Sequence, residues 1–122
     1  MTDLRESPLF ARAYDLVKES CIQSERFPRA RRAVLVRRME DSAFGFSDAI
    51  TDASKSQDPR PLLLRADAAL VRWRLCLRLC VDLKLLSDGR MEELMRLVAE
   101  SGRLLGGWQR KLGPQPQRPG PR

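Results

Sequence analysis

Three short breaks divide the sequence into four long segments whose apolar residues recur at helical spacing. The breaks are Phe27-Pro28, the polar loop of residues 55–61, and Ser87-Asp88-Gly89. Short clusters of proline, glycine and polar residues of this kind end helices. Between the breaks, apolar residues recur every three or four positions, and no segment shows the alternation of a half-buried strand. Four helices with short connections predict an all-α protein, an antiparallel up-down four-helix bundle.

We expect the bundle to occupy residues 8–112 as one domain. Ser7 is a candidate N-cap ahead of Pro8 at the first helical position, and Ser87 is a second candidate cap. Residues 1–7 are expected as a polar lead. Residues 113–122 contain four prolines and are expected as a disordered Pro/Gly/Arg tail. The helices are expected over residues 8–25, 28–54, 61–86 and 87–112.

Each expected helix has an apolar face that we assign to the core. In the first helix this face comprises Phe10, Ala13, Tyr14, Val17 and Cys21, widened by Leu9 and Leu16. In the second it comprises Ala33, Val34, Leu35, Met39, Ala43, Phe46 and Ile50. In the third it comprises Leu62, Ala66, Ala69, Leu70, Trp73, Cys76, Leu77 and Cys80. In the fourth it comprises Met91, Leu94, Met95, Val98, Gly102 and Leu105.

The third helix carries a second apolar stripe, opposite its core face. The stripe comprises Leu64, Ala68, Val71, Leu75 and Leu79. Arg74 and Arg78 separate the two faces on one side, and Arg65 and Arg72 on the other. A helix that is apolar on two faces must be covered on both, and an exposed stripe of this size is an association site. We therefore expect a homo-oligomer, the alternative being that the stripe packs against the diagonal helix of its own bundle.

The positive charge is concentrated in the second half of the chain. Residues 1–60 hold 11 basic and 10 acidic side chains, net +1, and residues 61–122 hold 12 basic and 6 acidic, net +6. A basic half indicates a nucleic acid, an anionic membrane or an acidic protein as partner. A membrane is disfavoured, because the apolar faces are committed to core and interface.

The candidate nucleic-acid contacts are arginines at helical spacing. A row on the fourth helix recurs every seven residues and ends beside a lysine. The full set comprises Arg96, Arg103, Arg110 and Lys111 on that helix, Arg65, Arg72, Arg74 and Arg78 on the third, and Arg29 and Arg32 near the start of the second. Such rows can follow a phosphate backbone, and the few aromatic residues argue against base reading. The alternative is an ordinary solvated charged face.

Catalysis, metal binding and secretion are not indicated. The chain has no histidine, which removes the commonest general base and metal ligand. The three cysteines form no CxxC pair, and we expect them in the core of a cytoplasmic protein. No apolar run is long enough for a signal segment or membrane span. We expect no enzyme activity, no catalytic residues, no metal and no cofactor.

Gly106, Gly107 and Trp108 form the most unusual motif. Each glycine inside a helix costs about 1 kcal/mol relative to alanine, yet helical spacing continues beyond them to Leu112. The motif therefore indicates a surface where another backbone comes close, and we count its three residues with the expected interface. A frayed helix end is the alternative.

Leu104-Leu105-Gly106-Gly107-Trp108, preceded by Gly102-Arg103, resembles the C-terminal signature of the accessory variability determinants of diversity-generating retroelements. The resemblance extends to Phe27-Pro28-Arg29 and to the junction of residues 82–87. It implies a ring-like homopentamer of four-helix bundles, encoded by a prokaryote or a phage. It also implies a reverse transcriptase as partner and binding of template RNA, or DNA, during mutagenic retrohoming.

Two other functions remain open. Related bundle proteins are encoded in 23S rRNA intervening sequences and would have no polymerase partner. A structural oligomer whose arginines meet an acidic protein is the third possibility.

Overall fold

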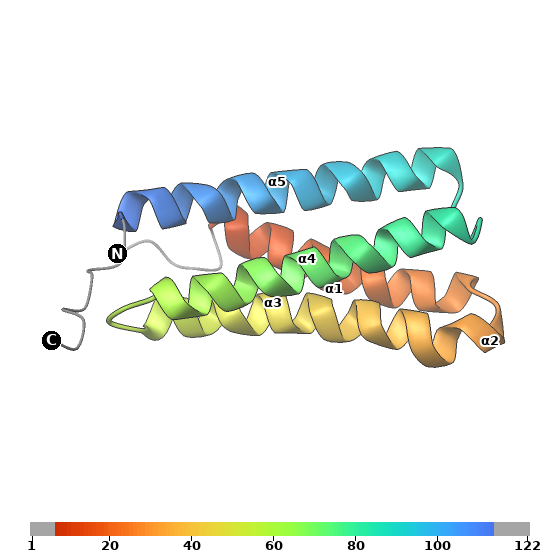
Figure 1. Ribbon diagram of the computed structural model, residues 1–122, viewed down its shortest axis with the longest axis horizontal. Coiled ribbons are helices and arrows are strands. Elements are labelled where there is room, and N and C mark those ends of the chain that lie inside the picture. Colours follow the sequence, from red (N-terminus) through yellow and green to blue (C-terminus); the bar gives the residue numbers. More distant parts are fainter. Residues whose placement is uncertain (1–6, 114–122) are drawn as a thin grey trace, which may run out of the picture.

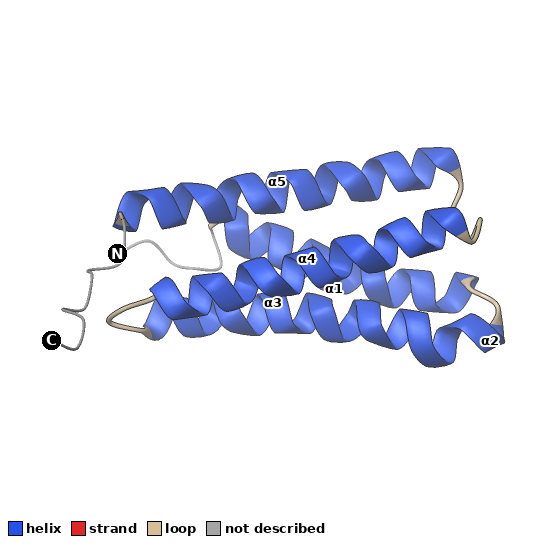
Figure 2. Cartoon of the chain, in the orientation of Figure 1, coloured by secondary structure: helices blue, strands red, loops and turns tan. Residues whose placement is uncertain are grey.

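The described residues form four long helices, which run alternately up and down in a single bundle (Figure 1). The computed structural model describes residues 7–113, apart from the side chains of Ser24, Arg31 and Arg32, and every regular element in this range is helical (Figure 2). The predicted all-α four-helix bundle is therefore confirmed. The elements are α1 (Pro8–Arg26), α2 (Arg29–Arg31), the π-helical segment η2 (Arg32–Val36), α3 (Arg37–Lys55), α4 (Arg60–Asp82) and α5 (Asp88–Leu112). The expected lead and tail lie outside the described residues, except for Ser7 and Gly113.

The second helix of the bundle is a continuous run of α2, η2 and α3. The wider π-helical turn covers Arg32–Val36, where the helix begins beside the end of α1. Leu35 and Val36 are buried in this turn, while Ala33 and Val34 face outward. The expected core face of the second helix was therefore wrong at these two positions, and Val34 is 65% exposed.

Serine side chains cap two helices, as the sequence predicts. The Ser7 hydroxyl oxygen accepts a 3.4 Å hydrogen bond from the backbone N–H of Phe10, ahead of α1. The Ser87 hydroxyl oxygen accepts one of 3.2 Å from the N–H of Arg90, ahead of α5. Each bond satisfies one of the backbone donors that a helix start leaves without an intrahelical partner.

The α4 helix ends earlier than the sequence suggested. We expected it to reach Leu86, but it ends at Asp82. The N–H of Leu85 donates to the C=O of Cys80 at 2.9 Å, and Lys84 adopts a left-handed conformation with φ of 58°. This six-to-one hydrogen bond with a left-handed residue is the Schellman arrangement that ends many helices. Glycine usually occupies that position, and because a lysine stands here the end of the helix could not be recognised from the residue types.

Arg60 ties the α3–α4 connection to the end of α5. Its Nη2 donates a 2.9 Å hydrogen bond to the C=O of Leu112, and its Nε donates one of 3.5 Å to the C=O of Gly113. Its Nη1 pairs with Asp58 at 3.0 Å. The last carbonyls of a helix have no intrahelical partner, so a cation that donates hydrogen bonds to them satisfies these acceptors. Its positive charge also interacts favourably with the negative end of the helix dipole.

The core lies along the bundle axis, and each long helix packs against two others. The α3 helix packs beside α1 and α4, and α5 packs beside α1 and α4, so α1 and α4 are diagonal. The largest fully buried side chains include Trp73, Phe27, Phe46 and Leu16. Of the expected core of α4, seven residues are buried, but Leu63 is buried in place of Leu62, which is half-buried.

The expected core face of α1 was rotated from the real one. Tyr14 is 60% exposed and Cys21 is also exposed, whereas Ser20 and Gln23 are buried. Leu9, Ala13 and Leu16 of the expected face are buried, so the prediction was wrong only toward Tyr14 and Cys21, where the polar Ser20 and Gln23 are buried instead. Among the described residues of α1, the buried ones are Leu9, Ala13, Leu16, Ser20 and Gln23.

On α5, Leu94, Val98 and Leu105 of the expected core are buried, Met91 and Gly102 are half-buried, and two positions were predicted wrongly. Met95 is 49% exposed, while Ser101 is completely buried. The Ser101 hydroxyl donates a 2.7 Å hydrogen bond to the C=O of Leu97, one turn earlier. A serine that bonds its own helix backbone in this way can be buried without another polar partner.

Polar contacts also join α1 to α5. Arg90 forms ion pairs with Glu19 and, at 2.7 Å, with Glu93. The amide of the buried Gln23 is oriented with its carbonyl oxygen toward Arg90. In this orientation the oxygen accepts hydrogen bonds of 2.7 Å from the Arg90 Nε and 2.9 Å from the Arg90 Nη2. Arg12 reaches Glu100 at 3.5 Å near the other end of α1.

Candidate assembly and nucleic-acid surfaces

The apolar stripe of α4 lies on the outside of the single chain. Leu64, Val71, Leu75 and Leu79 are 60%, 51%, 67% and 46% exposed, and Ala68 is half-buried. The alternative that this stripe packs against the diagonal helix is therefore wrong, because that helix is α1, on the far side of the core. Four large apolar residues along one helix make an exposed patch of the kind that marks an interaction site.

A groove of ≈850 Å³ extends this surface toward the start of the second helix. Val34, from the π-helical segment, lies along it with Leu75, Leu79 and Leu83 of the α4 side. Val34 was expected in the core, and Leu83 was expected on no surface. Val34 and Leu83 could have been recognised as surface candidates, because each is an apolar residue displaced from the regular apolar stripe of its helix. Arg37, Arg38, Arg72 and Asp41 supply the charges of this groove.

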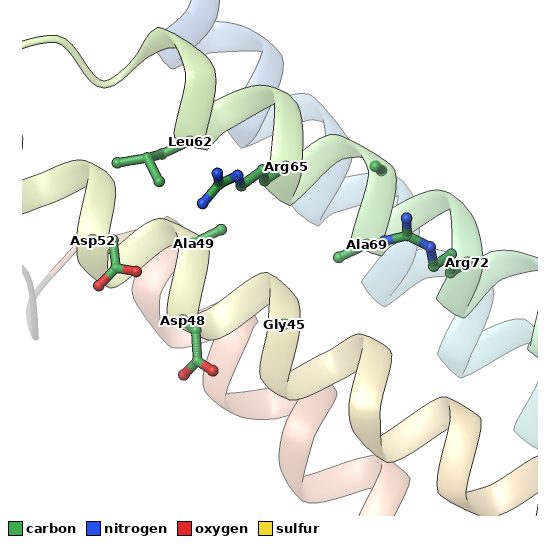
Figure 3. Close-up of a pocket in the computed structure, with 9 residues that line it drawn as sticks. Gly45, Asp48, Ala49, Asp52, Leu62, Arg65, Ala69 and Arg72 are labelled. Atoms are coloured by element: carbon green, nitrogen blue, oxygen red, sulfur yellow. The ribbon is translucent and has the colours of Figure 1, made fainter.

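A smaller groove of ≈320 Å³ runs between α3 and α4 (Figure 3). Gly45, Ala49, Ala68 and Ala69 are among the small residues that line it. Asp48 and Asp52 stand on the α3 side, and Arg65 and Arg72 on the α4 side. In Figure 3 the carboxylate of Asp48 points away from the guanidinium groups of Arg65 and Arg72. No ion pair of the described residues joins these four side chains.

The predicted arginine row of α5 is exposed along its length. Arg96, Arg103, Arg110 and Lys111 all face solvent. Arg96 lies 3.7 Å from Glu92 on the same helix, and the other three form no ion pair with a described carboxylate. Charges without an internal partner remain available to an external one.

The other predicted contacts lie on different faces of the bundle. Arg74 and Arg78 are exposed on α4, toward α5, and Arg65 and Arg72 are exposed on the α3 side. Arg29 is exposed at the start of α2. The side chain of Arg32 lies outside the described part of the structure. The nine predicted residues with described side chains therefore lie on more than one face of the bundle.

Gly106 and Gly107 lie inside a helix that continues to Leu112, so the frayed-end alternative is wrong. A Cβ on Gly106 would lie 3.2 Å from the Arg110 Nη1, and one on Gly107 would lie 3.9 Å from its Nη2. No atom of another helix is within 4 Å of either position. The bundle itself therefore does not require glycine here, and the half-buried Trp108 beside them packs against the core.

The thiols are poorly suited to chemistry. Burial raises the pKa of Cys80 to about 12, with a further contribution from Cys76, and burial likewise raises the pKa of Cys76. The pKa of Cys21 is also raised, by desolvation first and by the nearby Glu40 second. Thiolates are the reactive and metal-binding form. No three Cys, Asp or Glu side chains among residues 7–113 are placed so that together they could hold a metal ion.

No described helix is long and apolar enough to cross a membrane. The described residues thus form a helical bundle with an exposed apolar stripe on α4 and exposed arginine rows. The model of the bAvd-like family matches residues 9–112, and the chain belongs to this family. The predicted relationship to the accessory variability determinants is thereby confirmed, and the family is an accessory, non-catalytic one. No curated protein and no solved structure matches the chain.

Proposed function

We propose that this chain is the accessory subunit of a diversity-generating retroelement. In this proposal it assembles into a ring-like homo-oligomer, five copies by the family resemblance, and binds both the reverse transcriptase of the element and its template RNA. The polymerase supplies the chemistry of mutagenic cDNA synthesis. The accessory ring supplies a basic scaffold that holds the RNA beside the polymerase.

The observation that carries the RNA part is the row of Arg96, Arg103 and Arg110 on α5. Three arginines spaced by seven residues lie along one side of a helix and face solvent, and two of them have no described acidic partner. Each contact between such a side chain and a phosphate releases counterions, so a row of them binds a polyanion without reading its sequence. Self-assembly would multiply the row in a single particle.

Binding of a labelled single-stranded template RNA, followed by fluorescence anisotropy over a salt series, tests this proposal. The double variant Arg103→Glu/Arg110→Glu should bind at least tenfold more weakly. Its slope of log affinity against log salt should be shallower by about 1.4, because each lost phosphate contact removes about 0.7.

The matched control is Lys18→Glu/Lys55→Glu, which changes the net charge by the same amount. Both lysines are exposed, on α1 and at the end of α3. Equal weakening by the two double variants would mean that only net charge matters. No RNA binding by the wild-type chain near 100 mM salt, where non-specific binders still associate, would overturn the RNA part.

The polymerase part is tested separately, by co-expression with the reverse transcriptase encoded nearest to this gene. A stable complex recovered by size exclusion after nuclease treatment is the expected result. A gene inside a 23S rRNA intervening sequence, with no polymerase gene nearby, would favour the intervening-sequence alternative. Binding to acidic proteins but not to RNA would favour the structural-oligomer alternative.

A further inference from the structure

We propose that copies of this chain associate through two different surfaces, the outer face of α3 and the apolar stripe of α4. The α3 surface is centred on Phe44 and includes the neighbouring carboxylates Glu40, Asp41 and Asp48; we call it the Phe44 face. It packs on the α4 stripe of the next copy. This inference rests on the self-assembly proposed above and names the contact that produces it.

Phe44 is an exposed aromatic residue within a group of acids. It is 49% exposed on α3. Residues three or four positions apart are neighbours on the surface of a helix. The neighbours of Phe44 at these spacings include Glu40, Asp41 and Asp48. No ion pair of the described residues involves these three carboxylates. Aromatic residues, phenylalanine included, are enriched at protein interfaces relative to the rest of the surface.

The α4 stripe has the complementary character. Its leucines and Val71 are flanked by Arg65 and Arg72 on one side and by Arg74 and Arg78 on the other. These four guanidinium groups likewise form no ion pair with a described carboxylate. An apolar stripe bordered by cations therefore matches an aromatic residue bordered by anions. Such charge complementarity selects partner and register at an interface.

The two surfaces also lie at the same height along the bundle. The Cβ position of Gly45 is 3.8 Å from the Cβ of Ala69, so Phe44 is level with the middle of the α4 stripe. Asp48 shares the smaller α3–α4 groove with Arg65 and Arg72. Rotation about an axis parallel to the bundle keeps each residue at its own height. In a ring of this kind Phe44 therefore meets the section of the neighbouring stripe around Val71.

The charges of one copy remain available to the next. Figure 3 shows the carboxylate of Asp48 pointing away from Arg65 and Arg72 of its own chain. Ion pairs between copies would join the carboxylates of the Phe44 face to the arginines beside the α4 stripe without moving α3 or α4. This assignment removes the four arginines that border the α4 stripe from the candidate RNA contacts and leaves the α5 row in that role.

A contact between two different surfaces is heterologous, and repeating it generates a closed ring when the rotation closes. An isologous contact, in which α4 stripes pair with each other, would stop at a dimer. It would also bring the arginines beside the stripe toward one another, which like-charge repulsion disfavours. The two arrangements therefore differ in stoichiometry and in the residues they require.

Mixing two defective variants tests the inference. Phe44→Asp disables the α3 surface and Leu75→Asp disables the α4 surface, and both sites are exposed in the single chain. Each variant alone should remain monomeric under conditions in which the wild type assembles. Their equimolar mixture should form a dimer of twice the 14.0 kDa chain mass, because one intact pair of surfaces remains. The two introduced carboxylates repel, so the mixture should stop at two copies.

Light scattering after size exclusion gives the masses, and circular dichroism checks that each variant keeps its helical content. Met95→Asp, a comparable change at an exposed site on α5, should assemble like the wild type. Asp48→Arg examines the Phe44 face without changing Phe44, and should lower the assembled fraction at a given concentration at least tenfold.

Normal assembly of folded Phe44→Asp, or a mixture that remains monomeric, would overturn the two-surface contact while leaving self-assembly in place. A monomeric wild-type chain would overturn self-assembly and this contact together. The RNA measurement described above is independent of both results.

Discussion

The indole Nε1 of Trp73 donates a 2.7 Å hydrogen bond to the hydroxyl oxygen of Ser20 across the centre of the bundle. Trp73 lies on α4 and Ser20 on α1, so the bond joins the two diagonal helices. The Ser20 hydroxyl in turn donates to the C=O of Leu16 at 2.7 Å. Both residues are buried. The two linked hydrogen bonds give the indole N–H of Trp73 and the hydroxyl of Ser20 partners inside the core, where buried polar groups need them.

Ser20→Ala should lower the free energy of unfolding by about 1–3 kcal/mol, because the Trp73 N–H would remain buried without an acceptor. Urea unfolding followed by tryptophan fluorescence measures this loss. The matched control is Ser101→Ala, which also removes a buried hydroxyl. That hydroxyl bonds only its own helix backbone, so the control should change the stability by less than about 0.5 kcal/mol. Equal losses in the two variants would contradict the role assigned to Ser20.

Lys84→Gly should stabilise the bundle by about 0.5–1 kcal/mol. Lys84 is the one described non-glycine residue with a positive φ, at 58°, and glycine adopts this conformation without steric strain. Thermal unfolding should show a midpoint raised by a few degrees. Asp82→Gly, in the last turn of α4, is the control and should destabilise by a similar amount. A lower midpoint for Lys84→Gly would show that its side chain has a stabilising contact.

Alkaline pH should destabilise the protein through Cys80. The folded pKa is raised from 9.0 to about 12 by burial, so the unfolded chain releases this proton first. The stability from the neutral thiol is complete below pH 9.0 and is lost as the pH rises toward about 12. Between pH 8 and pH 10 the thiol should account for about 1 kcal/mol of lost stability.

Urea titrations of the wild type and Cys80→Ala at the two pH values isolate this contribution. The variant should be less stable at both values because it leaves a small cavity. Its change between them should nevertheless be smaller than that of the wild type. Equal changes in the free energy of unfolding between the two pH values, in the wild type and in Cys80→Ala, would show that the Cys80 thiol has the same pKa in the folded and unfolded chain.

Gly107→Ala should raise the stability of the single chain by up to about 1 kcal/mol, since alanine favours a helix and the added methyl meets only the end of Arg110 at 3.9 Å. Gly107→Leu should retain the helical content but weaken assembly or polymerase binding at least tenfold. Circular dichroism and the pull-down with the reverse transcriptase measure the two effects. Loss of helical content in Gly107→Leu would instead place Gly107 in the core of the bundle.

The local signals in the sequence were sufficient for the architecture. Ser7 and Ser87 cap the helices they were expected to cap, and the proline and glycine breaks separate the four helices. These features act through neighbouring backbone groups, so they can be recognised without knowing what lies across the bundle. The outward stripe of α4 was also predictable, because its residues repeat on one helix.

Features that depend on contacts between helices were not predictable. Ser20 and Gln23 are buried on α1 because Trp73 and Arg90 meet them from other helices, and their polarity shifted the expected face toward Tyr14 and Cys21. Phe44 was placed on no face, and its position level with the α4 stripe follows only from the packing of Gly45 against Ala69.

By itself, the sequence determined four amphipathic helices, their order, the exposed second stripe of α4 and the family of the protein. These properties depend on spacing along the chain, which is local. Only the tertiary structure decided which polar residues of α1 and α5 are buried and which charged groups of the described residues remain without an internal partner. Those outcomes depend on how the helices rotate to pack against one another, and that rotation minimises the energy of all four helices together.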